Sequence, residues 1–204
     1  MPPLDQNETL QNHQSLATRH IANEYRTGAT PSPKDVTAQC ASEDHLRHLA
    51  TTDALTGLAN YRRLSETLES EIKRSQRTAR AFAVLLFDLN GLKRINDSRG
   101  HLVGNWALCR VADIFLSSCR SIDTAARYGS DKFAIILPET GAHEADAVGR
   151  RICERLSNDR QEPLLSVSVG IVVYPEDGTT IESLFQATDR TLYKMKQLGG
   201  ASRV

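Results

Sequence analysis

The sequence predicts an α/β fold in which helices flank a mixed β-sheet. Short apolar runs of strand length alternate along the chain with longer segments that carry apolar residues at helical spacing. The expected order in the core is strand, helix, helix, strand, strand, helix, strand, helix. This order predicts an α/β sandwich, elaborated from the ferredoxin-like motif, with helices over one face of the sheet.

The chain divides into three parts by composition. Residues 1–42 are polar and are broken at Thr30–Pro33, so we expect an extension that is partly disordered or holds a short helix. Residues 43–198 are expected to form one domain, which starts with a linker helix running from Ser42 to Thr51. Residues 199–204 form a C-terminal tail. A chain of 204 residues has room for one such domain and an extension.

The first long helix and the first strand have clear patterns. Between Tyr61 and Arg77, Leu64, Leu68 and Ile72 follow one helical stripe. The run 82–87 is continuously apolar, which is typical of a strand buried on both faces. Further helices are expected at 92–99, 103–119, 142–156 and 181–198, and further strands at 123–128, 131–137 and 164–173.

A hairpin joins the second and third expected strands. Gly129 and Ser130 between two strand-like runs predict a two-residue type II′ turn, with Gly129 at the first central position. The turn would place the Asp131 carboxylate at the start of a strand. Asp88 supplies a second carboxylate, at the end of the apolar run 82–87. Two carboxylates at strand ends are suited to a divalent metal that also binds phosphate.

Composition excludes several classes of function. Lys plus Arg number 25 and so do Asp plus Glu, so there is no overall basic field to attract nucleic acid or an anionic membrane. The apolar run 81–87 is too short to span a bilayer. The N-terminus lacks the pattern of an export signal, and the four cysteines show no C-x-x-C spacing. We therefore expect a cytoplasmic protein with reduced thiols.

Several spaced motifs together resemble one family. The motifs are DALTGLAN (Asp53–Asn60), FDLNGLKRINDSRGHLVGN (Phe87–Asn105), RYGSDKFAIILP (Arg127–Pro138), SVGI (Ser168–Ile171) and DRTLYKMK (Asp189–Lys196). Over about 43–198 the chain resembles the GGDEF domain of diguanylate cyclases. The resemblance implies a nucleotidyl-cyclase-type fold that joins two GTP molecules into cyclic di-GMP, with one half-site on each protomer of a homodimer. The linker helix is similar to the segment through which members dimerise.

The resemblance also implies a metal site. Asp88 and Asp131 match the family's catalytic, metal-binding carboxylates, and the backbone carbonyl of Leu89 matches a further ligand. The implied cofactor is Mg²⁺ on the triphosphate, where it lowers the cost of attack by a 3′-hydroxyl on the α-phosphorus.

Five other positions match nucleotide-binding residues of the family. Asn96 and Asn105 stand at the positions that bind guanine. Lys93 and Lys196 match lysines that contact phosphates, and Gly129 belongs to the turn that backs the phosphates.

The signature departs from the family pattern. Ser130 and Lys132 replace the second Gly and the Glu, and the Lys132 charge opposes metal binding. Asn105 replaces an aspartate, and because an amide both donates and accepts, guanine selectivity should fall and a mixed GTP/ATP product is conceivable. Asn90, Leu92 and Gly200 also depart from common family residues. These changes predict weak or absent cyclase activity.

A second site of the family is complete. Arg120 and Asp123 form the R-x-x-D pattern, at the spacing where members bind cyclic di-GMP as a feedback inhibitor, and Arg151 matches that site's secondary arginine. A guanidinium can bond the O6/N7 edge of guanine, while a carboxylate accepts from N1 and N2.

Three hypotheses remain open at this point. The chain is a degenerate GGDEF domain that binds cyclic di-GMP and signals to a protein partner. Alternatively, it is a working cyclase that uses GTP, or GTP and ATP, with Mg²⁺. The third hypothesis is an interaction module that keeps the fold and binds neither nucleotide.

Overall fold

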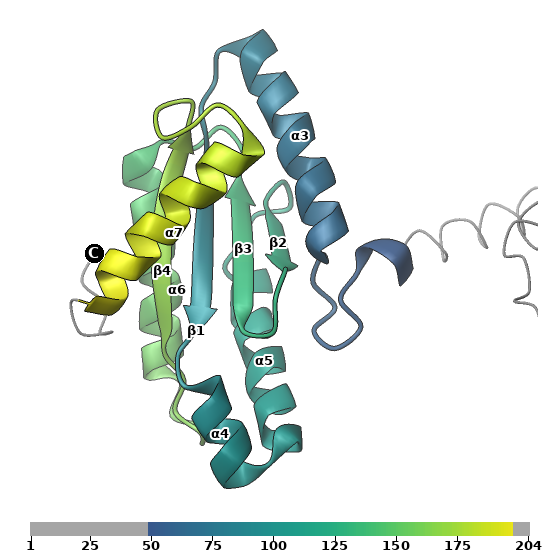
Figure 1. Cartoon of the computed structure of the whole chain (residues 1–204), viewed down its shortest axis with the longest axis vertical. Coiled ribbons are helices and arrows are strands. Elements are labelled where there is room, and N and C mark those ends of the chain that lie inside the picture. Colours follow the sequence, from purple (N-terminus) through teal and green to yellow (C-terminus); the bar gives the residue numbers. More distant parts are fainter. Residues whose placement is uncertain (1–48, 198–204) are drawn as a thin grey trace, which may run out of the picture. The chain divides into compact units, whose positions relative to one another are not determined.

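The computed structural model describes residues 49–197, which form a four-stranded sheet with helices on both sides (Figure 1). The strands are β1 (Phe82–Leu89), β2 (Thr124–Arg127), β3 (Lys132–Leu137) and β4 (Val167–Tyr174). The helices are α3 (Tyr61–Thr78), α4 (Leu92–Arg99), α5 (His101–Leu116), α6 (Ala142–Asn158) and α7 (Ile181–Gln197).

The strand order is β2-β3-β1-β4, and each neighbouring pair is antiparallel. With the connections β1-α4-α5-β2-β3-α6-β4, this is the ferredoxin-like arrangement. The α/β class is therefore confirmed. In the described part of the chain, parallel pairing is limited to an isolated bridge between Ala59 and Ala126.

Helices cover both faces of the sheet, so the expectation of a single covered face is wrong. Leu85 and Phe87 of β1 pack in the cluster that includes α5 and α6. Val84 and Leu86 pack in the other cluster, with α3 and α7. The cause is visible in β1 itself, where all eight residues are buried.

Aromatic contacts anchor each of the two clusters. On the α5/α6 side, the Phe115 ring lies 4.7 Å from that of Phe87 and 5.5 Å from that of Phe133. On the α3/α7 side, Phe82 and Tyr174 stack with ring centroids 4.9 Å apart. Burying each such side chain contributes roughly 1.5–3 kcal/mol, so both faces hold the strands in place.

Most element boundaries lie close to the predicted ones, and the differences have local causes. Gly100, at φ +82°, ends α4 and immediately precedes α5, so α5 begins two residues before the expected Val103. Strand β4 begins at Val167 rather than Leu164, because the buried Arg110 holds the preceding loop through the carbonyl of Pro163 at 3.0 Å.

The predicted type II′ turn is wrong. That turn needs a positive φ at Gly129, and Gly129 is not among the described glycines with positive φ. The backbone N–H of Tyr128 donates to the carbonyl of Lys132 at 3.0 Å, so three residues, Gly129 to Asp131, lie between the bonded pair. We call these three residues the signature turn.

Some predictions lie outside the described residues. They are the extension 1–42, the tail 199–204 and most of the linker helix, of which only residues 49–51 are described, as helix. Lys196 lies within α7, but its side chain is not described. No helix within 49–197 has the length and apolar character needed to cross a membrane.

Candidate nucleotide and inhibitory sites

The two candidate metal ligands, Asp88 and Asp131, lie at the end of β1 and at the end of the signature turn, directly before β3. The backbone N–H of Leu89 donates to the carbonyl of Asp131 at 2.9 Å. Asp88, one residue earlier, is 9% exposed and pairs in register with Lys132 on β3 and Ser168 on β4. The structure thus brings Asp88 and Asp131 to one end of the central strands.

The Leu89 carbonyl also points toward this region. In an antiparallel strand the N–H and C=O of one residue point toward the same neighbouring strand. Since the Leu89 N–H bonds Asp131, its carbonyl faces the same side. The apolar Leu89 side chain is buried in the α5/α6 cluster, which fixes this orientation.

Lys132 lies on the same face of the sheet as Asp88. Ala134 and Ile136 of β3 belong to the α3/α7 cluster, so Lys132 is on that face by alternation. Asp88 is on the same face, because Val84 and Leu86 are. Directly paired residues place their Cβ atoms about 5 Å apart, so the Lys132 side chain begins beside that of Asp88.

The exposed Ser130 contacts the other acid. Its hydroxyl donates to Oδ1 of Asp131 at 2.9 Å. This hydrogen bond occupies one acceptor site of a carboxylate that is a candidate metal ligand.

Tyr128 is a member of this region that sequence reasoning missed. Its ring packs edge-on against Phe185 of α7, with centroids 5.8 Å apart. Burial raises the pKa of its hydroxyl, and the negative charges of Asp189, Asp88 and Asp131 raise it further. The phenol therefore stays protonated among three carboxylates. The position of Tyr128 directly before Gly129 was the sequence feature that could have marked it as a residue of this region.

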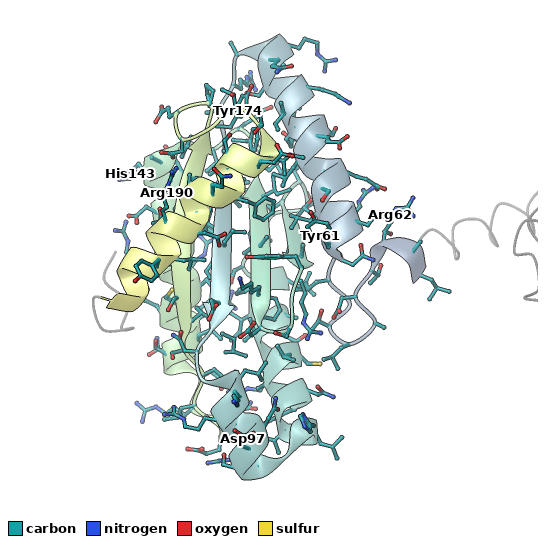
Figure 2. The ribbon with its side chains drawn as sticks, in the orientation of Figure 1. Tyr61, Arg62, Asp97, His143, Tyr174 and Arg190 are labelled. Atoms are coloured by element: carbon teal, nitrogen blue, oxygen red, sulfur yellow. The ribbon has the colours of Figure 1, made fainter. Side chains whose placement is uncertain are left out.

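The candidate base-binding residues lie where α4 meets α5. A Cβ added to the buried Gly104 would lie 1.9 Å from Oδ1 of Asn96, so the missing side chain at 104 leaves the space that the amide occupies. Asn105 follows on α5 and is exposed, as is Lys93 on α4. Figure 2 marks this end of the domain by Asp97 of α4, with Tyr174 of β4 at the opposite end.

Hydrogen bonds of Arg127 connect the signature turn to the turn before α3. Arg127 Nη1 lies 3.2 Å from Asp53 Oδ1, and its Nη2 donates to the carbonyl of Ser130 at 2.7 Å. Burial raises the pKa of Asp53, but hydrogen bonds from the Thr56 hydroxyl and N–H, together with Arg127, outweigh it and leave the pKa lowered.

The candidate inhibitory residues surround the end of α5. Asp123 accepts from the backbone N–H of Arg120 at 2.7 Å through Oδ2, and Arg151 of α6 donates to the carbonyl of Ser118 at 2.8 Å. Burial and the charge of Asp123 raise the pKa of Cys119 to about 11, against an opposing effect of Arg151. Asp123 and Arg151 therefore both act on one thiol, Cys119.

One oxygen of this group has no partner. Among the residues described, Asp123 Oδ1 is a buried acceptor that receives no hydrogen bond. Buried acceptors in native proteins are normally satisfied, so this oxygen is an exception among the described residues.

Comparison with known proteins agrees with the resemblance. The family model "Diguanylate cyclase, GGDEF domain" matches residues 50–202. The bifunctional diguanylate cyclase/cyclic di-GMP phosphodiesterase MucR of Pseudomonas aeruginosa is 36% identical over 167 residues, which cover 80% of this chain and 24% of MucR.

Two solved structures are similar in fold. A sensory box/GGDEF family protein from Caulobacter crescentus superposes with a TM-score of 0.67 at 34% identity, covering 73% of this chain and 99% of that one. The GGDEF domain of DgcB from the same organism, solved in complex with c-di-GMP, gives a TM-score of 0.68 at 26% identity and covers 74% and 93%.

The chain matches MucR over about a quarter of that protein's length, so the match concerns one domain of a larger protein. The family model, in contrast, covers most of this chain, from the turn before α3 to beyond α7. The chain therefore belongs to the GGDEF family, the domain family of diguanylate cyclases, and its domain is one of cyclic di-GMP signalling.

Proposed function

We propose that this chain is a cyclic di-GMP receptor built on a degenerate GGDEF domain, with weak or no cyclase activity. The observation that carries the proposal is the complete R-x-x-D pattern of Arg120 and Asp123, in which the Asp123 carboxylate is held beside Arg120 by the Arg120 N–H. Guanine can donate to such a carboxylate through N1 and N2.

The two arginines would complete the recognition. Arg120 is exposed and can turn its guanidinium toward the O6/N7 edge of guanine, where a planar fork makes two parallel hydrogen bonds. Arg151 is already oriented by the Ser118 carbonyl, which leaves its remaining donors for a phosphate of the ligand. The complex of the DgcB GGDEF domain with c-di-GMP supports this ligand class for a chain of the same fold.

The weak activity follows from the charge at the other site. Asp88, Asp131 and the Leu89 carbonyl are hard oxygen donors and fit Mg²⁺, which when bound would neutralise the triphosphate. Within residues 49–197, no group of three or more acidic, His or Cys side chains could hold a metal ion, so these ligands depend on the nucleotide to complete the shell. Lys132 beside Asp88 adds positive charge where a cation must bind, which opposes loading of the site.

Calorimetric titration with cyclic di-GMP tests the proposal. The wild type should bind, and Arg120→Ala should weaken binding by at least about thirtyfold, because a hydrogen bond to a charged group contributes roughly 2 kcal/mol. Asp123→Asn should also weaken it. Arg62→Ala is the matched control, since Arg62, which Figure 2 labels on α3, is exposed and pairs with Glu66 of the same helix. Unchanged affinity in Arg120→Ala would overturn the proposal.

A second candidate is a working cyclase for GTP, or for GTP and ATP. The bond between Leu89 and Asp131 favours it, because it holds the two metal-binding acids together. Lys132→Glu should then raise Mg²⁺-dependent GTP binding by about tenfold, or about 1.4 kcal/mol. Lys73→Glu makes the same charge change on an exposed position of α3 and should have no effect. Efficient conversion of GTP by the wild type would contradict the receptor proposal.

The partners in this proposal are cyclic di-GMP and GTP as ligands, a second copy of the chain, and a protein that reads the bound state. Sedimentation with and without cyclic di-GMP tests the homodimer. If neither nucleotide shifts the melting temperature, the remaining hypothesis, a module that binds other proteins only, gains support.

A further inference from the structure

A cavity of about 670 Å³ lies between α4 and the segment that leads into β4. Arg94, Ser98 and Arg99 line it from α4, and Glu162, Pro163 and Leu164 line it from the opposite segment. Its volume is that of a small-molecule site. We propose that this cavity binds a small organic anion, a phosphomonoester or carboxylate carried on an apolar ring or chain. The proposal does not rest on the proposed function.

The cavity is distinct from the candidate nucleotide residues of α4. Arg94 and Ser98 are four residues apart and share one flank of the helix. Lys93 and Asn96 are three residues apart and share another flank, where Asn96 packs against Gly104 of α5. The cavity therefore opens on the side of α4 that faces β4.

Arg94 provides the charge. Arg99 is paired with Glu162 at 2.8 Å, so its charge is compensated. Within the part of the chain that the structure describes, Arg94 has no ion pair, and its guanidinium lies over Gly91, where a Cβ would be 3.4 Å from Nη2. An unpaired guanidinium in a concave site suits a phosphate or carboxylate, which it can bind with two parallel hydrogen bonds.

The loop side of the cavity is held rigidly. Arg110 is 7% exposed and pairs with Asp159, while Nη2 donates to the carbonyl of Gln161 and Nη1 to that of Pro163, each at 3.0 Å. The Trp106 ring covers the same guanidinium at 4.8 Å. A loop fixed in this way needs little ordering when a ligand binds.

The floor is polar and also fixed. The Asn90 N–H donates to the Ser166 carbonyl at 2.9 Å, and its side-chain amide donates to the Ser166 hydroxyl at 3.3 Å. Leu164, which is 67% exposed, lines the cavity together with Pro163 and Ile95. The cavity thus combines one cation and several hydroxyl and amide groups with an apolar wall, which selects an anion with an apolar body over a bare ion.

Titration of the full chain with phenyl phosphate, followed by ¹H–¹⁵N spectra, tests the proposal. The amide signals of Asn90, Gly91 and Ser166 should shift at millimolar probe. Arg94→Gln should weaken binding by about tenfold or more. Arg77→Gln, which removes an exposed arginine from the last turn of α3, should leave it unchanged. Leu164→Ser should weaken phenyl phosphate but not inorganic phosphate.

Three results would overturn the proposal. The first is the absence of any shift. The second is equal affinity for phenyl and inorganic phosphate, which means an adventitious ion only. The third is loss of binding in Lys93→Gln but not in Arg94→Gln, which places the probe at the nucleotide residues. Titration of Arg94→Gln with cyclic di-GMP separates the two proposals, because that affinity should equal the wild-type value.

Discussion

Arg127 Nη1 lies 3.2 Å and 3.3 Å from the two carboxylate oxygens of Asp53, although 74 positions separate the residues in the chain. The same guanidinium bonds the Ser130 carbonyl. One side chain therefore fixes the signature turn to the turn before α3, so a displacement of the earlier turn acts on the signature turn through Ser130.

Replacing Arg127 by Met should destabilise the domain by about 2 kcal/mol, because the half-buried Asp53 loses a charged partner and the Ser130 carbonyl loses a donor. Urea unfolding measures the change. Arg62→Met, which breaks an exposed pair, should cost less than about 0.5 kcal/mol. Equal costs in the two variants would show that the Asp53–Arg127 pair contributes nothing beyond a surface contact.

Stability should fall at acidic pH through two carboxylates. The pKa of Asp159 is lowered, first by its hydrogen bond from Arg110, and that of Asp53 is lowered as well. A lowered native pKa adds stability above the ordinary value of 3.8 that is lost as the pH falls through the lowered pKa. Unfolding curves between pH 6 and pH 2 should therefore show a decline below about pH 4. Asp53→Asn should be less stable than the wild type at pH 6 and should lose less on acidification.

Gly104→Ala should impair nucleotide binding. The new Cβ would lie 1.9 Å from Asn96 Oδ1, so the amide must leave its position between α4 and α5. The expected loss is about tenfold in GTP affinity, the same as in Asn96→Ala. In the double variant the second substitution should add little, because both remove the same contact. Fully additive losses would contradict this account.

Cys119 should react slowly with alkylating reagents. With a pKa of about 11, only about one thiol in a thousand is ionised at pH 8. Mass spectrometry should show its labelling rate rising steeply as the pH approaches 11. Asp123→Asn should speed labelling at pH 8, because it removes the negative charge that raises the pKa. A rate at pH 8 that is indifferent to Asp123 would show that the carboxylate does not act on the thiol.

The sequence predicted the elements well where the apolar pattern is strong. Helix α4 has the predicted bounds, Leu92–Arg99, because Leu92 and Ile95 face the core and Gly100 ends the helix. The order of strands and helices along the chain, and the ferredoxin-like arrangement, also followed from the pattern. The pattern did not predict which faces of the sheet the helices cover. The buried run of β1 showed that both faces need cover, but only the contacts of α3 and α7 with the second face show which helices supply it.

The candidate site shows the same division. Asp88 and Asp131 were predicted because motifs mark them, and the structure brings their backbones together through the hydrogen bond from the Leu89 N–H to the Asp131 carbonyl. The turn geometry was wrong, because a Gly-Ser pair is also compatible with a longer connection in which Gly129 needs no positive φ. Tyr128, Gly104 and the position of Lys132 beside Asp88 depend on which residues of distant elements become neighbours. The sequence alone does not predict these contacts between distant elements.

The hairpin of β2 and β3 limits how this domain can change. Asp123 precedes β2 at one end and Asp131 lies in the turn beyond the other end, so the four residues of β2, about 14 Å long, lie between the two acids. Insertion or deletion of one residue in β2 would turn Ala126 to the opposite layer and shift both acids against their neighbours at once. Substitutions can therefore alter either end of the hairpin alone, whereas a change of length in β2 alters both together.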